Sequence, residues 1–365
     1  MEQQQTPEQV HTPQPQNSIG RRILRRCTRV LLVILETALL LCIALYGVMF
    51  VLAKGPSPTA RNLFVLSVRE TSAVGFLADW FFTPQEIAQI EQGANDTQLE
   101  DTDTSLIVIP DDSQKPEDDT PREDPWGLTD EDGDGIILET VKGEGFSGYM
   151  MVVTDPSRVI MASKTDSFGH RGYTVAQMVH EFDAVAGINA GGFYDPDGQG
   201  NGSIPDTMVV YEGNIYYPDY GCAGGFVGID DQHILHVGNF TPQQIKDRKI
   251  QYGVGFGPVL ISNGVAVNNA VSGVNPRTGI GQRSDGAILL LVIDGRQVSS
   301  LGATYQDMTD IFLSYGAVNA CNLDGGSSTV MWYEGDYINN CASVLGIRPV
   351  PTTFLVLKEE VENHG

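Results

Sequence analysis

The sequence predicts an α+β protein: a single mixed-sheet domain with hairpins and a few helices, preceded by an N-terminal transmembrane helix. Three observations lead to this fold class. Short apolar runs joined by Gly-Asn or Asn-Gly pairs indicate β-hairpins. Two segments with apolar residues at helical spacing indicate α-helices between them. An uninterrupted apolar run near the N-terminus is long enough to cross a bilayer. Hairpins mixed with helices favour α+β over a regular doubly wound sheet.

The N-terminal region predicts a signal anchor. Residues 1–29 form a cytoplasmic tail that is rich in arginine near its end, and residues 30–53 form an apolar run of 24 residues. A transmembrane helix needs roughly 20 such residues, and a cleaved signal peptide has a shorter apolar region. Positive charge before the span and acidic sequence after it orient the N-terminus to the cytoplasm. We therefore expect a single-pass protein of the cell membrane whose remaining chain is extracytoplasmic.

Two segments of different composition follow the span. Residues 54–94 have apolar side chains among polar ones at helical spacing and predict a juxtamembrane helical stalk. Residues 95–133 predict a disordered acidic linker, since 15 acidic and 2 basic side chains between 96 and 134 carry −13 of the net charge of −24. This acidity, with no basic stripe outside the arginine-rich flank, excludes a nucleic-acid partner. Residues 130–135 resemble half of a calcium loop, but Val141 replaces the glutamate that an EF-hand needs.

The folded domain is predicted to span residues 134–360 and to contain two similar units. Residues 174–189 and 304–322 each begin with a helix and continue into a short apolar strand. Both strands end in an asparagine that is followed, within three residues, by a Gly-Gly pair. We hypothesise a pseudo-repeat that places Asn189 and Asn322 at corresponding strand ends facing one site. Coincidence is the alternative for matches this short.

Strands fill the space between these units. Residues 208–216 and 258–267 each consist of two apolar runs joined by a Gly-Asn or Asn-Gly turn, which predicts two hairpins. Residues 287–293 are almost continuously apolar, so we expect a central strand that is buried on both faces.

The five cysteines predict no disulfide framework. Cys27 and Cys42 belong to the membrane region, which leaves Cys222, Cys321 and Cys341 outside it. An odd number allows at most one bridge and one free thiol, and the spacing does not decide the pairing. The spacing also does not suit zinc. We predict neither a metal nor a cofactor.

Polar residues that terminate the apolar strands are the candidates for a functional site. The most informative is Asp324, which follows a buried strand and precedes two glycines and two serines. Such a turn lets backbone N–H groups approach a ligand closely, although Asp-Gly is also a common hairpin connection. Arg277 offers the planar set of donors that suits phosphate. Two carboxylates and an arginine fit hydrolysis of a sugar phosphate. The strand-end residues are Asn189, Asp195, Asp294, Asn322 and Asp324.

Four motifs in order resemble the phosphodiester glycosidase family. They occupy residues 187–193, 276–281, 292–296 and 322–328, and the likeness extends over roughly residues 145–358. The resemblance implies hydrolysis of the bond between the anomeric carbon of a sugar and a phosphodiester, as in N-acetylglucosamine-1-phosphodiesters. Bacterial members are often described as exopolysaccharide biosynthesis proteins, which implies a bacterial cell-envelope protein.

The resulting prediction is a membrane-anchored extracytoplasmic glycosidase that acts on sugar-1-phosphodiesters of cell-surface glycans. We expect Asp324 and Asp294 to be the catalytic carboxylates, with the assignment of acid and base left open. The expected substrate-binding residues, from the motif matches and the strand ends, are Asn189, Gly191, Gly192, Asp195, Arg277, Thr278, Arg296, Asn322, Gly325, Gly326 and Ser327.

Two other functions fit the same residues. A non-catalytic envelope module that binds polysaccharide would keep Arg277 and the glycine turns but tolerate loss of Asp324. A transferase would move sugar phosphate onto a cell-wall acceptor in place of water. The sequence determines neither the sugar nor the oligomeric state.

Overall fold

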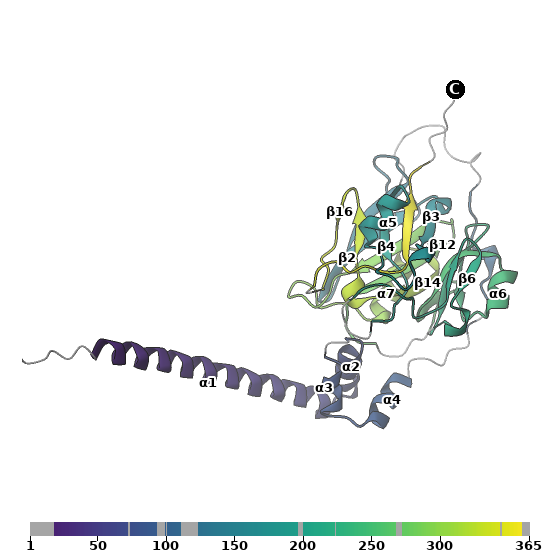
Figure 1. Ribbon diagram of the computed structural model, residues 1–365. Coiled ribbons are helices and arrows are strands. Elements are labelled where there is room, and N and C mark those ends of the chain that lie inside the picture. The colour runs from purple at the N-terminus through teal and green to yellow at the C-terminus, as the bar shows by residue number, and fades with distance from the viewer. Residues whose placement is uncertain are drawn as a thin grey trace, which may run out of the picture. The chain divides into compact units, whose positions relative to one another are not determined.

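The computed structural model describes residues 18–71, 74–92, 99, 101–110, 123–195, 200–222, 224–267, 272–343 and 345–359. It divides into two compact units, Met1–Pro56 and Ser57–Gly365, which are described separately. The first contains the helix α1 (Ser18–Lys54), in which Leu24–Lys54 is long and apolar enough to cross a membrane (Figure 1). The predicted cytoplasmic tail lies largely outside the described residues.

Three short helices open the second unit, so the predicted helical character of this region is confirmed. They do not form a free stalk, because the first of them packs onto the folded domain. Its side chain Leu66 is buried, and the hydroxyl of Ser67 accepts a hydrogen bond of 3.0 Å from the backbone N–H of Val274. The helices are α2 (Pro58–Arg69), α3 (Phe76–Asp79) and α4 (Pro84–Gln92).

The largest sheet of the second unit has seven antiparallel strands, in the order β1-β2-β13-β12-β14-β10-β11. Its central part confirms the predicted strand at 287–293, because β13 lies between β2 and β12 and is buried along its whole length. The strands are β1 (Ile136–Gly143), β2 (Phe146–Val153), β10 (Val259–Ser262), β11 (Val265–Ala266), β12 (Arg277–Arg283), β13 (Ile288–Ile293) and β14 (Ala317–Leu323).

Two five-stranded antiparallel sheets complete the domain. The first has the order β16-β15-β4-β17-β3, with strands β3 (Val159–Ala162), β4 (Ala184–Asn189), β15 (Met331–Tyr333), β16 (Asp336–Tyr337) and β17 (Thr353–Leu357). The second has the order β6-β5-β9-β7-β8, with strands β5 (Val209–Tyr211), β6 (Asn214–Tyr216), β7 (Phe226–Asp230), β8 (Leu235–Gly238) and β9 (Ile250–Gly255). The hairpins predicted at 208–216 and 258–267 are therefore confirmed as β5–β6 and β10–β11.

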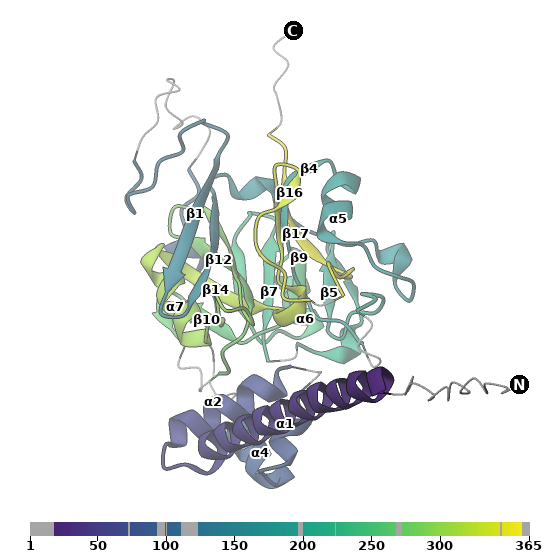
Figure 2. The same cartoon turned by 90° about the vertical axis from the view of Figure 1, so that its left-hand side faces the viewer.

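A single apolar core joins the three sheets, and each sheet has a helix on its other face. The central core includes Met151, Ile188 and Val227, one from each sheet. Side chains along β13 alternate between this core and a second cluster beneath α7 (Tyr305–Ser314), which is why its sequence is continuously apolar. Figure 2 shows α7 beside β10 and β14, and α5 (Val175–Glu181) beside β4 and β17. Helix α6 (Pro242–Asp247) contributes Ile245 to a cluster with β5 and β7. This arrangement confirms the α+β class.

The structure bears on three further expectations, which concern the acidic linker, the pseudo-repeat and the cysteines. The linker predicted at 95–133 is ordered in part, because within 101–110 Ile107 is buried and the Val108 N–H donates to the Ser284 carbonyl over 2.8 Å. The strands of the hypothesised pseudo-repeat, β4 and β14, lie in different sheets. All five cysteines are free thiols.

Candidate active site

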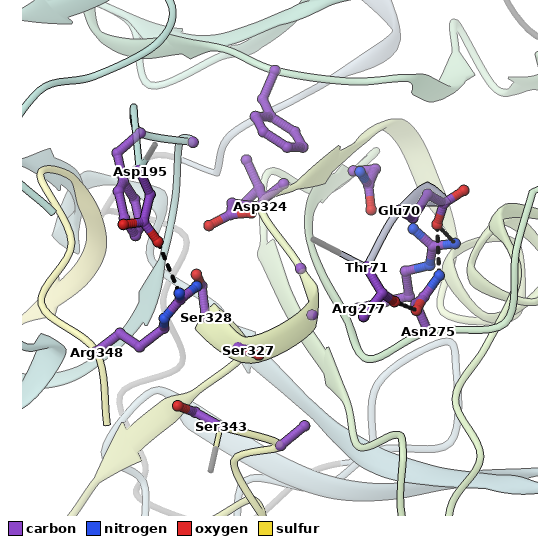
Figure 3. Close-up of a pocket in the computed structure, with 18 of the residues that line it drawn as sticks. Glu70, Thr71, Asp195, Asn275, Arg277, Asp324, Ser327, Ser328, Ser343 and Arg348 are labelled. Carbon is purple, nitrogen blue, oxygen red and sulfur yellow. Dashed lines mark hydrogen bonds and ion pairs between the residues drawn. The ribbon is translucent and has the colours of Figure 1, made fainter. Parts of the chain in front are cut away.

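A cavity of about 870 Å³ opens where the turns after β4 and β14 meet the start of β12. Figure 3 shows Asp324 in its middle, between the Asp195–Arg348 pair on one side and a group that contains Arg277 on the other. The end of α2 contributes to the lining as well, through Glu70. The cavity thus draws on segments that are far apart in the sequence.

Local packing places Asp324 at the end of β14. Its backbone N–H donates to the Ala190 carbonyl over 2.9 Å, and its own carbonyl accepts the Asn189 side-chain amide over 2.5 Å. The next two residues have to be glycines. A Cβ at Gly325 would lie 2.7 Å from the Pro276 carbonyl oxygen, and Gly326 has a φ of +61°. The turn therefore holds the carboxylate against the cavity through backbone contacts.

The environment of Asp324 favours its protonated form. Burial is the largest cause and raises the pKa of this carboxyl to about 7, with a smaller contribution from the charge of Asp206. Hydrogen bonds from the Ser328 hydroxyl and the Gly325 backbone act in the opposite direction. A carboxyl that titrates near neutral pH can exchange a proton with a bound substrate or water.

Asp206 is a second carboxylate of this cavity. Both of its oxygens lie 2.8 Å from the position that a Cβ on Gly192 would occupy, so glycine at 192 leaves the room for them. Burial raises the pKa of Asp206 as well.

Arg277 is held rigidly at one end of the cavity. Its Nε donates to the Ala303 carbonyl over 3.0 Å, and its Nη2 donates to the Gly273 carbonyl over 2.6 Å. The guanidinium lies 4.3 Å from the centre of the Tyr305 ring. Its Nη2 also forms a 2.9 Å ion pair with Glu70. A buried arginine fixed in this way is a ready partner for an anion.

Arg296 brings a second guanidinium to the same end. Its Nη2 donates to Thr71 Oγ1 over 2.8 Å and to Asn275 Oδ1 over 3.1 Å. Burial, and next the positive charge of Arg277, lower the pKa of Arg296. Because the two guanidinium groups are close enough for the charge of one to disfavour the charge of the other, together they attract a negatively charged ligand.

The opposite end is closed by an ion pair. Asp195 Oδ2 accepts from Arg348 Nη2 over 2.9 Å, and the Asp195 carboxylate also accepts from the Gly200 N–H. Asn322 also lines the cavity, and its Nδ2 donates to the Gly257 carbonyl over 2.7 Å. Its buried Oδ1 has no hydrogen-bond partner among the described residues.

Most of the residues predicted for substrate binding line this cavity. They are Gly192, Asp195, Arg277, Arg296, Asn322, Gly325, Gly326 and Ser327, together with the predicted catalytic Asp324. Asn189, Gly191 and Thr278 lie behind the lining. Asn189 Oδ1 accepts from the Thr278 hydroxyl over 3.0 Å and from the Val330 N–H over 3.1 Å, while the Gly191 N–H donates to Thr352. Asn189 therefore braces the turn that carries Asp324.

Asp294, the second predicted catalytic carboxylate, also does not line the cavity. It is buried, and its oxygens accept hydrogen bonds from the Asn339 side chain, the Asn340 backbone and the Asn340 side chain at 3.2, 2.9 and 3.1 Å. These donors satisfy the carboxylate and tie the end of β13 to the loop after β16.

The sequence analysis did not predict several of the residues that line the cavity. Asp206 stands in a loop before a predicted strand, and Glu70 was assigned to a stalk outside the domain. Arg348 lies beyond the last predicted motif, which ends at residue 328. A motif search around strand ends cannot find them, since only the folded chain brings these segments together. The unanticipated residues that carry polar or aromatic side chains into the cavity include Glu70, Thr71, Asp206, Phe256, Asn275, Tyr305 and Arg348.

Comparisons with known proteins identify the domain. Residues 182–357 match the phosphodiester glycosidase family. The SPbeta prophage-derived uncharacterized protein YomE of Bacillus subtilis is 33% identical over 180 residues, which are 46% of this chain but 27% of that relative.

Among solved structures, the catalytic domain of zebrafish N-acetylglucosamine-1-phosphodiester alpha-N-acetylglucosaminidase aligns with a TM-score of 0.50 and 18% identity, over 61% of this chain and 82% of that one. A putative exported protein of Burkholderia pseudomallei aligns with a TM-score of 0.43 and 16% identity, over 58% and 74%. The zebrafish match supports the fold. The match over residues 182–357, which contain the four motifs around the cavity, places this segment in the phosphodiester glycosidase family.

Proposed function

We propose that this domain hydrolyses sugar-1-phosphodiester bonds, with water as the acceptor. The observation that carries the proposal is a carboxyl with a pKa of about 7, Asp324, in a cavity whose one end presents two guanidinium groups. Arg277 and Arg296 would bind the phosphate, and the sugar would occupy the space between them and the Asp195–Arg348 pair. The side chains of Asn322 and Phe256, which line the cavity, would contact that sugar.

The chemistry of the leaving group favours a role for Asp324 as the base. An alkyl phosphate leaves as a stable anion, because even its second ionisation has a pKa of about 6. It needs little help from an acid, whereas the attacking water needs a proton acceptor. A carboxyl with a pKa near 7 is matched to that task at neutral pH. Asp206 would stabilise the positive charge that develops on the sugar ring.

We also propose that α1 anchors the protein in a membrane with the domain on the extracytoplasmic side, where cell-surface glycans would be its substrates. The length and apolar composition of Leu24–Lys54 and the arginines before it support this arrangement. A cysteine introduced at the exposed position Val298 should react in intact cells with a membrane-impermeant thiol reagent. Labelling only after lysis would show instead that the domain lies on the cytoplasmic side of the membrane.

The enzymatic proposal is tested with an aryl ester of N-acetylglucosamine-1-phosphate, using the parent and an Asp324→Asn variant. Release of free sugar by the parent, reduced about 10²-fold or more in the variant, is the expected result. The rate of the parent should rise with pH through about 7, as a base requires. Equal rates for both proteins would remove Asp324 from catalysis. Polysaccharide binding without hydrolysis of any sugar-1-phosphodiester would favour the non-catalytic module instead.

A further inference from the structure

The short helix α3 presents two aromatic side chains to solvent. It begins with Phe76 and is capped at its C-terminus by Trp80, which are 53% and 57% exposed. Their rings make a T-shaped contact with centres 5.7 Å apart. Large apolar side chains that stay exposed together mark an interaction surface. Tryptophan gathers where a bilayer meets water, because its ring combines an apolar body with a polar N–H group.

The aromatic pair is held in place by the packing of its own segment onto α2. Ala78 and Phe81 are buried, and the Phe81 ring meets the ring of Phe64 in α2 with centres 6.0 Å apart (Figure 1). Phe76 and Trp80 are therefore left outside by a segment that is itself folded.

The chain confines this pair to the neighbourhood of the apolar helix. Lys54 ends α1 and Pro58 begins α2, so the connection between them reaches no more than about 14 Å. Phe64 lies six residues further into α2, which adds about 9 Å. Because Phe81 contacts Phe64, covalent reach alone keeps it within roughly 30 Å of the end of α1. With α1 in a bilayer, as proposed above, α3 stays beside the membrane surface.

The same segment also connects directly to the cavity. Thr71 lines the cavity and accepts a hydrogen bond of 2.8 Å from Arg296. The Thr71 carbonyl accepts from the Val74 N–H over 3.0 Å, and the Val74 carbonyl accepts from the Leu77 N–H over 2.9 Å. These hydrogen bonds join the guanidinium end of the cavity to α3, and Phe76 is only five residues from Thr71. A phosphate bound at this end would lie close to a membrane that α3 contacts.

We propose that Phe76 and Trp80 insert into the headgroup region of the bilayer that α1 spans, and that the substrates are sugar-1-phosphodiesters whose second ester is a membrane lipid. This inference rests on the proposed function, since it names the alcohol on the phosphate. Water attacks the anomeric carbon, the bond from that carbon to the phosphate oxygen breaks, and a proton of the water passes to Asp324. The free sugar leaves into solution, and the lipid phosphate stays in the bilayer.

The membrane contact is tested by fluorescence quenching, which requires no hydrolysis. The full chain is reconstituted into phosphatidylcholine vesicles, with and without phospholipids brominated on the acyl chains near the headgroup, as the parent and as Trp80→Phe. The other two tryptophans pack against side chains of the domain, Trp126 against Arg283 and Trp332 against Tyr337. We expect brominated lipid to quench the parent and to leave Trp80→Phe unquenched. Equal quenching of both proteins, or quenching of neither, would overturn the inference.

Extraction with alkaline carbonate separates this inference from the proposed anchor. A parent protein that carbonate removes from the vesicles would refute the anchoring of α1 and the inference with it. A parent that carbonate leaves in the vesicles, but whose Trp80 is not quenched, would refute the inference alone.

The substrate class is tested with two esters of N-acetylglucosamine-1-phosphate, a hexadecyl ester in the vesicles and an aryl ester in solution. Phe76→Ser combined with Trp80→Ser should slow hydrolysis of the hexadecyl ester about tenfold or more and leave hydrolysis of the aryl ester unchanged. The control Tyr220→Ser replaces an aromatic side chain that is 51% exposed, and it should change neither rate.

Two results of this experiment would count against a proposal. Equal hydrolysis of the hexadecyl ester by the parent and the double variant would overturn the lipid-linked substrate. Hydrolysis of neither ester by the parent would refute the proposed function, whereas quenching of Trp80 would still support the membrane contact.

Discussion

Asp324 and Asp294 show how two aspartates at strand ends acquire different properties from their surroundings. Asp324 faces a cavity, and burial raises its pKa to about 7. Asp294 is buried too, but three donors from Asn339 and Asn340 satisfy its charge. A carboxyl that faces a cavity and titrates near neutral pH is available for chemistry, whereas a carboxylate held by three donors from one loop fixes that loop in place.

The raised pKa of Asp324 makes stability depend on pH. The folded state holds this proton more tightly than the unfolded chain, in which the pKa is near 3.8, so the parent loses stability as pH rises from about 4 to about 7. Asp324→Asn abolishes that loss. We expect the variant and parent to be equally stable at pH 4, and the variant to be more stable by up to about 4 kcal/mol at pH 8. Urea unfolding at both values measures the difference, and the exposed substitution Glu334→Gln is the control. A constant difference across pH would contradict the assignment.

The satisfied carboxylate of Asp294 leads to the opposite expectation. Asp294→Asn places an amide against the donors of Asn339 and Asn340 and leaves at least one of them unpaired. We expect a loss of about 1–3 kcal/mol in the free energy of unfolding and a smaller reduction in kcat than that of Asp324→Asn. Thermal unfolding and steady-state kinetics check both parts. Loss of activity equal to that of Asp324→Asn, at unchanged stability, would return Asp294 to the catalytic role that its motif suggested.

At the scale of elements, glycines permit the close approaches that build the cavity. The turn after β14 passes against Pro276 because Gly325 has no side chain, and α2 passes equally close to the segment before β12. A Cβ at Gly273 would lie 2.5 Å from the backbone nitrogen of Ser67. These backbone contacts hold the turn and the helix against the same end of the cavity.

Gly273→Ala should therefore loosen α2. Its Cβ would meet backbone atoms of Ser67 that cannot yield by side-chain rotation, so the helix has to shift. We expect faster hydrogen exchange of α2 amides, by about tenfold or more, with unchanged protection in β13. Mass spectrometry after proteolysis resolves the two segments. Val298→Ala, at a fully exposed side chain, is the control and should alter neither rate. Unchanged exchange in α2 of the glycine variant would show that the helix is held by other contacts.

At the scale of the molecule, one core supports three sheets, and the cavity lies where their ends meet. Asp324 follows a strand of the seven-stranded sheet, and Asn189 reaches its carbonyl from a strand of another sheet. The core side chain Met151 is fully buried in the cluster to which all three sheets contribute. The position of the carboxylate thus depends on how the sheets pack.

Met151→Ala should destabilise the whole second unit. Removing a fully buried methionine lowers the free energy of unfolding by about 2–5 kcal/mol. Because Ser57–Gly365 is one compact unit, we expect a single thermal transition that moves to lower temperature and does not split. Circular dichroism and intrinsic fluorescence should give the same midpoint. Two separated transitions would show that the sheets unfold independently.

The sequence by itself determined the elements and the motifs of this protein. Hairpins, helices and the buried strand at 287–293 depend on local turn chemistry and on the period of apolar residues, which neighbours in the chain reveal. The same local patterns placed Asp324, Arg277 and the glycine turns among the candidates. The four motifs indicated the family for a related reason, since three of them are a strand end with the turn that follows it and the fourth, 276–281, is the start of β12.

Only the tertiary structure decided which of these residues share a cavity and what else joins them. Asn189 and Asp294 end strands as Asp324 does, but hydrogen bonds from distant segments turn them into supports. The local sequence does not single out Asp206 or Glu70, because a carboxylate in a loop or at a helix end is usually solvated. Only the fold brings Asp206 close to Asp324 and Glu70 into contact with Arg277. The acidic segment near Ile107 is ordered by the domain on which it lies, and not by its own composition. Burial and long-range contacts are properties of the packed chain, so no local pattern contains them.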